Sequence, residues 1–258
     1  DTMTLLNMPQ KFVHLHVHSH YSLLDGLSKI DALVNKAVEY EMPALALTDH
    51  GNLYGAIEFY KKARRAGIKP ILGLEAYVAR RSRFDKVSGV DDKRYHLTIL
   101  ATNIEGWKNL IQLSTKSHLE GFYYKPRVDH DLLREYAGGI IALSGCMSGE
   151  IPRALLSGEH ERALELARQY QEIFGKENFF IELSHHPNIQ NHTKLQEMLR
   201  ELAATEHIPV VATQDIHYTN TEDAKAQDVL LAIQTNSRLD DADRLTMKLD
   251  DFSLRSSE

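Results

Sequence analysis

Short apolar runs alternate with longer amphipathic stretches along most of the chain. Runs rich in Val, Ile, Leu, Phe and Tyr predict strands at about seven places, which are residues 12–17, 44–47, 70–74, 95–100, 139–143, 179–183 and 209–212. Apolar residues at helical spacing predict helices over residues 29–40, 54–66, 105–119, 160–174, 190–206 and 222–234. Segment 80–94 contains Gly89 and several charges, which predict an exposed loop.

The alternation of strand and helix predicts an α/β domain with a parallel sheet. Six or seven such units in one chain favour a closed or nearly closed barrel, and an open doubly wound sheet is the alternative. In both architectures ligands gather at the carboxyl ends of the strands. The functional site is therefore expected at that edge of the sheet.

Residues able to bind metals lie at the ends of these runs. His16 and His18 close the first run, and the same spacing recurs near the end of the chain at Asp215 and His217. Further candidates of the same kind lie between these two pairs, namely Asp25, His50, Glu75, His96 and Cys146. His96 is the exception, because it lies at the start of its run.

Strand geometry allows both side chains of a pair such as His16 and His18, or Asp215 and His217, to bind one ion. Residues two apart in a strand project from the same face, so His16 and His18 can present both rings to one point. The alternative is a strand with surface histidines, which is less able to explain two such pairs. Glu75 and Asp215 are candidates to bridge neighbouring ions. Mixed imidazole, carboxylate and thiolate ligands favour Zn²⁺, Mn²⁺ or Fe²⁺ over Mg²⁺ or Ca²⁺.

Composition narrows the class of protein. With 258 residues, 43% of them hydrophobic, the chain is long enough for one large domain or two small ones, and we favour one. The formal net charge of −6 argues against nonspecific binding of nucleic acid by the whole surface. A single cysteine excludes an intrachain disulfide, and no long apolar stretch or signal peptide is visible. These features predict a cytoplasmic protein that does not contact membranes.

Four segments carry a resemblance to a known family. They are FVHLHVHSHYSLLDG (12–26), ALTDHGNL (46–53), KPILGLE (69–75) and LSGC (143–146). In this order they resemble the polymerase and histidinol phosphatase (PHP) domain, in the form found at the start of bacterial replicative DNA polymerases. The resemblance implies a PHP domain over residues 12–238, preceded by an extension or cloning remnant (1–11). Residues 239–258 would then lead toward a polymerase core that this chain does not contain.

The resemblance also implies a fold and a set of ligands. The family has a distorted seven-stranded, TIM-like (β/α) barrel with three divalent ions in a cleft at the carboxyl ends of the strands. Carried onto this sequence, the first ion would be bound by His16, His18, Glu75 and Asp215. Glu75 would bridge to a second ion, also bound by His96 and Cys146, and the third would be bound by Asp25, His50 and His217. All nine positions carry a residue able to bind a metal.

The implied reaction is metal-dependent hydrolysis of phosphodiesters, in the form of 3′→5′ exonuclease proofreading at single-stranded or frayed DNA 3′ ends. Implied partners are the polymerase core and a separate proofreading exonuclease subunit. The candidate catalytic residues are Asp49, His50, Asp215 and His217. The candidate substrate contacts are Tyr21, Arg80, Arg81, His185 and His186.

Several of these residues can also be interpreted without a functional role. His185 and His186 are also consistent with solvent-facing loop histidines, and the cations of segments 80–83 and 61–65 with solvated faces. Three alternative functions are a small-molecule phosphatase of the histidinol phosphate type, a metal-stabilised docking module, and a thiol hydrolase built on Cys146. The last has no matching signature around its cysteine.

Overall fold

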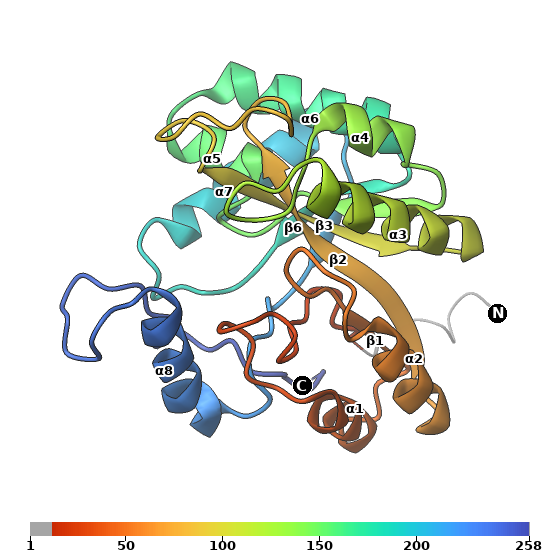
Figure 1. Cartoon of the computed structure of the whole chain (residues 1–258), viewed down its shortest axis with the longest axis vertical. Helices are drawn as coiled ribbons and strands as arrows, with labels where there is room; N and C mark the ends of the chain where they lie inside the picture. The colour runs from red at the N-terminus through yellow and green to blue at the C-terminus, as the bar shows by residue number, and fades with distance from the viewer. Residues whose placement is uncertain (1–11, 258) are drawn as a thin grey trace.

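The computed structural model describes residues 12–257 and shows a curled mixed sheet covered by helices (Figure 1). The strands are β1 (Ala44–Leu47), β2 (Lys69–Ala79), β3 (Arg94–Ala101), β4 (Arg127–Val128), β5 (Ile140–Leu143), β6 (Phe179–Leu183) and β7 (Val210–Ala212). Their order is β1-β2-β3-β5-β6-β7, and β4 pairs with β2. The predicted residues 1–11 extension lies outside the described residues.

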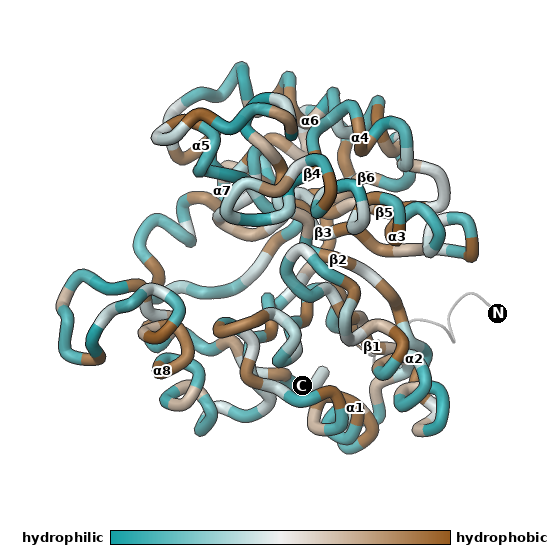
Figure 2. The backbone as a smooth tube through the Cα atoms, viewed as in Figure 1, coloured by the Kyte–Doolittle hydropathy of each residue, from teal (hydrophilic) through white to brown (hydrophobic). Residues whose placement is uncertain are grey.

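The helices match the predicted ones to within two residues at either end. They are α1 (Ile30–Glu39), α2 (Ala56–Arg65), α3 (Ile104–Leu119), α6 (His160–Phe174), α7 (His192–Thr205) and α8 (Ala224–Gln234). The short helices α4 (His130–Glu135) and α5 (Glu150–Leu156) and the single turn η2 (Thr221–Asp223) were not predicted, because one or two turns are too few to establish a helical period. Hydrophobic and hydrophilic positions alternate around the peripheral helices, as Figure 2 shows. None of the helices in residues 12–257 is both long and apolar enough to cross a membrane.

The prediction of a wholly parallel sheet is wrong at β3. This strand runs antiparallel to both of its neighbours, β2 and β5. The reason is that β2 and β3 are joined by the loop 80–93, which contains no helix and so returns the chain as a hairpin. Because β3 runs the opposite way, its first residues lie at the same edge as the carboxyl ends of the parallel strands. The position of His96 at the start of its run is thereby explained.

The predicted first strand is also wrong, because segment 12–17 forms only an isolated bridge from Val17 to Ile216. Its backbone nevertheless bonds to both ends of the sheet. The carbonyl oxygen of His14 accepts from Ala46 of β1, and that of His16 accepts from Ile216, beyond β7. The segment thus lies between the first and last strands, and the described residues form a curled half-barrel rather than a regular closed barrel.

The loop 80–93 is anchored more firmly than an exposed loop would be. Most of its residues are exposed, as predicted, but Asp91 is buried. The fully buried guanidinium of Arg127 donates hydrogen bonds to the carbonyl oxygens of Arg83, Asp85 and Asp91. Asp91 also accepts two hydrogen bonds from Arg81. A charge at the base of the hairpin therefore fixes its conformation.

Candidate metal centre

The two histidines that end segment 12–18 are fully buried beside two carboxylates. The Nε2 atoms of His16 and His18 lie 3.3 and 3.4 Å from Oδ1 of Asp215. The same atoms lie 3.4 and 3.5 Å from the two carboxylate oxygens of Glu75. Ligand atoms around one tetrahedral ion, each about 2.1 Å from it, are themselves about 3.4 Å apart. The four side chains have the spacing of ligands to a single ion.

Several donor atoms of this group have no hydrogen-bond partner although they are buried. They are Nε2 of His16, Nε2 of His18, Nδ1 of His50, Oε2 of Glu75 and Oδ1 of Asp215. Buried polar atoms without partners are rare in folded proteins because they lose hydration without compensation. Divalent cations bound within the cluster would supply partners for these atoms. The residues present therefore fit a metal centre.

A second group surrounds the far side of Glu75. Its Oε1 atom lies 2.9 Å from Nδ1 of His96 and 4.0 Å from Sγ of Cys146. Its Oε2 atom contacts Nδ1 of His50. Glu75 is thus placed to bind more than one ion, as a bridging carboxylate does.

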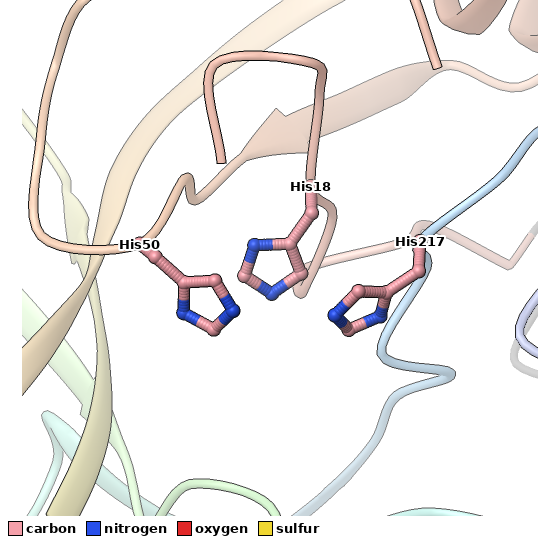
Figure 3. Close-up of side chains that lie close together, drawn as sticks. All are labelled: His18, His50 and His217. Atoms are coloured by element: carbon pink, nitrogen blue, oxygen red, sulfur yellow. The ribbon is translucent and has the colours of Figure 1, made fainter. Parts of the chain in front are cut away.

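A third group is built around His18, His50 and His217, whose rings converge from three separate segments (Figure 3). The ring centroid of His18 lies 4.2 Å from that of His50 and 4.5 Å from that of His217. Asp25 contacts both outer rings, with Oδ2 at 2.7 Å from Nε2 of His50 and Oδ1 at 3.4 Å from Nε2 of His217. All nine predicted ligands accordingly lie in one continuous cluster.

The histidine rings are held by a further layer of polar residues. Nδ1 of His16 hydrogen-bonds the buried Glu182 of β6 at 2.7 Å, so its Nε2 faces Asp215. Thr213 donates to the same oxygen of Glu182 at 2.7 Å. Carboxylates commonly fix metal-binding histidines in this way. Glu182 was not predicted, although a carboxylate within the apolar run 179–183 is a usable signal.

Asp49 plays a corresponding part for His18. Nδ1 of His18 lies 2.9 Å from Oγ of Ser22, which donates to Asp49 at 2.8 Å. Ser19 donates to Asp49 from its backbone nitrogen at 2.7 Å. Asp49 is buried behind these serines, and burial raises its pKa. The structure places this predicted catalytic residue where it orients a ligand.

The surroundings shift the pKa values of the two histidines in opposite directions. Burial lowers the pKa of His18 to about 3, and the neighbouring His50 and His217 add to this effect. Burial acts the same way on His16, but Asp215, Glu182 and Glu75 outweigh it and raise the pKa of His16 well above its usual value.

Burial acts on the thiol of Cys146 in the opposite direction to its effect on the two histidines. Burial raises its pKa well above the usual range, and the negative charges of Asp215 and Glu75 raise it further. The sulfur is therefore protonated at neutral pH, and binding of a metal must displace that proton. A low-pKa nucleophile of the kind that a thiol hydrolase requires is not what this environment produces.

The five predicted substrate contacts lie in four different places. His186 is buried and faces the cluster through a cavity of about 280 Å³, and its ring stacks on Phe252 with centroids 4.1 Å apart. His185 is exposed outside this cavity, so the solvent-facing interpretation is right for His185 and wrong for His186. Arg80 and Arg81 line a different groove, described below. The hydroxyl of Tyr21 donates to Glu58 on α2.

Fold and cluster together define an α/β domain whose residues fit a metal centre, and comparison with known proteins identifies its family. The sequence pattern of the PHP domain matches residues 14–186, and the chain belongs to this family. It is 49% identical over 248 residues to DNA polymerase III subunit alpha of Treponema pallidum, covering 96% of this chain and 21% of that protein. It is 47% identical over 252 residues to the same subunit of Thermus aquaticus, covering 96% and 20%. The chain spans about a fifth of the length of these relatives.

Two solved structures share the fold. A protein of Bifidobacterium adolescentis, assigned as a metal-dependent phosphoesterase, superposes with a TM-score of 0.51 over 81% of this chain and 88% of that chain, at 14% identity. An amidohydrolase of Chromobacterium violaceum gives a TM-score of 0.51 over 80% and 87%, at 16% identity. At such low identity these likenesses concern the fold alone.

Proposed function

We propose that this chain is the metal-dependent phosphodiesterase domain of a bacterial replicative DNA polymerase, and that it removes nucleotides from DNA 3′ ends. The observation that carries the proposal is the set of buried, unpartnered donor atoms of His16, His18 and Asp215 at ligand spacing. The relatives that match nearly the whole chain are polymerase subunits. A polymerase extends 3′ ends, so a phosphodiesterase attached to it meets that end of the strand.

Each group of residues has a defined part in the proposal. His16, His18, Glu75 and Asp215 would bind a first divalent ion. Glu75 with His96 and Cys146 would bind a second, and Asp25 with His50 and His217 a third. When bound, Zn²⁺, Mn²⁺ or Fe²⁺ would supply an activated water and neutralise charge on the leaving oxygen. Leu231, Leu245 and Phe252 line the cavity beside the cluster and give it an apolar wall.

The proposal extends to the architecture and the cellular context. We take segment 12–18, which bonds to both ends of the sheet, as the closing element of a distorted TIM-like barrel. Residues 12–238 then form the catalytic domain of a cytoplasmic polymerase, and the chain beyond leads toward the polymerase core. Residues 252–254 first pack back on the domain, where Phe252 and Leu254 are buried.

A time course with a 5′-labelled single-stranded oligonucleotide and Mn²⁺ tests the activity. The parent protein is expected to produce a ladder that shortens from the 3′ end. The double variant His16→Ala, Asp215→Asn is expected to produce none. The matched control His160→Ala, Asp240→Asn removes the same groups from exposed positions outside the cluster and should retain the ladder. An intact oligonucleotide in the parent reaction would contradict the exonuclease assignment.

A further inference from the structure

A long groove adjoins the metal centre without containing it. It lies between the β2–β3 loop and the helices α5 and α6, which Figure 1 shows at the same end of the molecule. Its volume is about 850 Å³, compared with about 280 Å³ for the cavity over the cluster. His96 and Ser148 line both, so the groove opens directly onto the centre. A ligand that occupies the groove can therefore reach the ligands of the second ion.

The groove is basic, although the whole chain carries a formal net charge of −6. Three carboxylates line it, and they are outnumbered by the six cationic residues Arg80, Arg81, Lys93, Arg94, Arg153 and Arg162. The carboxylate of Glu150 is also engaged elsewhere, because it accepts a hydrogen bond from Tyr170 and contacts His130. The groove consequently presents a local excess of positive charge.

Several of these cations have no acidic partner that would neutralise them. Within residues 12–257, neither Lys93 nor Arg153 forms an ion pair, and both side chains are exposed. Arg94 donates to the carbonyl oxygen of Asp92, and Arg80 to the hydroxyl of Tyr95. Arg81 and Arg162 differ, because their guanidinium groups are paired with Asp91 and Glu165. Unpaired guanidinium and ammonium groups along one groove are suited to a chain of phosphates.

We infer that this groove binds the phosphodiester backbone of one DNA strand while the terminal nucleotide enters the cavity over the metal centre. The inference rests on the proposed function. The groove supplies cations, which suit the charged phosphodiester backbone. The cavity supplies apolar side chains such as Leu245 and Phe252, which suit the base and sugar of the terminal nucleotide. A single strand is favoured because a terminal nucleotide must leave its partner base to reach a buried centre.

Binding of a 5′-fluorescein-labelled 12-nucleotide oligothymidylate, followed by fluorescence anisotropy, tests the groove. The double variant Lys93→Ala, Arg153→Ala removes two exposed, unpaired cations. Each phosphate contact to a single strand contributes a salt dependence of about 0.7 in log K against log salt. The variant should therefore lower the slope by about 1.4 and weaken binding by about 10- to 30-fold at 0.1 M salt.

The matched control is Lys61→Ala, Arg64→Ala on α2, which removes two exposed cations outside the groove. Equal losses in both variants, or no loss in the groove variant, would overturn the inference. Thermal melting of both variants checks that the fold is intact. If the groove variant loses binding but the parent hydrolyses no DNA, the proposed function fails and the groove stands. If the parent hydrolyses DNA and the groove variant binds the oligonucleotide normally, the proposed function stands and the groove inference fails.

Discussion

The carboxylate behind His16 provides a quantitative test of the metal centre. Glu182 accepts from Nδ1 of His16 at 2.7 Å and from the hydroxyl of Thr213 through the same oxygen, Oε1. Its other oxygen, Oε2, has no hydrogen-bond partner. With its amide oxygen at the position of Oε1, the substitution Glu182→Gln keeps both hydrogen bonds and removes the negative charge, and it places an NH2 group at the buried position of Oε2.

The expected loss follows from the strength of the hydrogen bond to His16. A hydrogen bond to a charged group contributes about 1 to 1.5 kcal/mol more than one between neutral groups. Each 1.36 kcal/mol corresponds to about a tenfold change in an equilibrium constant. The affinity for the ion bound by His16 should fall about tenfold, which is at the lower end of the 10- to 100-fold range for such partners. Competition with a chromophoric chelator for Mn²⁺ or Zn²⁺ measures this directly.

The matched control is Glu177→Gln, an identical change at an exposed position just before β6. It should leave metal affinity unchanged. An affinity in Glu182→Gln within about twofold of the parent, with an unchanged melting temperature, would refute the claim that the Glu182 charge supports His16 as a ligand.

Three further outcomes are expected. The pKa values of His16, His50 and Cys146 are all raised, so protons compete with metal for these ligands. For each pH unit below those pKa values, the affinity for metal should fall by about tenfold per displaced proton. Metal titration from pH 8 to 6 measures this fall. Asp228→Asn should destabilise the fold by about 3 kcal/mol in denaturant unfolding at pH 7, since it breaks a nearly buried pair with Arg244 whose oxygen–nitrogen distances are 2.6 Å. The Asp228 pKa is lowered by Arg244, so this difference should be present above about pH 4 and disappear as the pH falls further. Chelation should lower the melting temperature by about 5–10 °C relative to protein at a Mn²⁺ concentration of 100 Kd, and an unchanged melting curve would count against a metal in the fold.

The location of the candidate site could be predicted because its chemistry lies at the ends of apolar runs. His16, His18, Asp215 and His217 carry both the residue type and the spacing, and the fold brings them together. What the spacing could not predict is the reversed direction of β3, which depends on a loop that returns without a helix. That reversal is the reason why His96 joins the cluster.

The groove beside the cluster could not be predicted from local sequence patterns, because its residues are far apart in the sequence. Arg80 and Arg153 line one groove although 73 residues separate them in the sequence, and the short helix α5 that carries Arg153 shows no helical period. Glu182 was missed for a different reason. A single carboxylate in an apolar strand faces either solvent or interior, and only the packing of His16 against β6 shows which.

The central claim is that the cluster hydrolyses phosphodiesters when it holds metal. The most direct test measures hydrolysis of bis(p-nitrophenyl) phosphate against added equivalents of Mn²⁺, in the parent protein and in Asp215→Asn. The account predicts a rate that rises with bound metal, reaches a plateau in the parent and is lost in the variant. A parent protein that binds Mn²⁺ and hydrolyses neither this diester nor DNA would contradict the account and favour a metal-stabilised docking module.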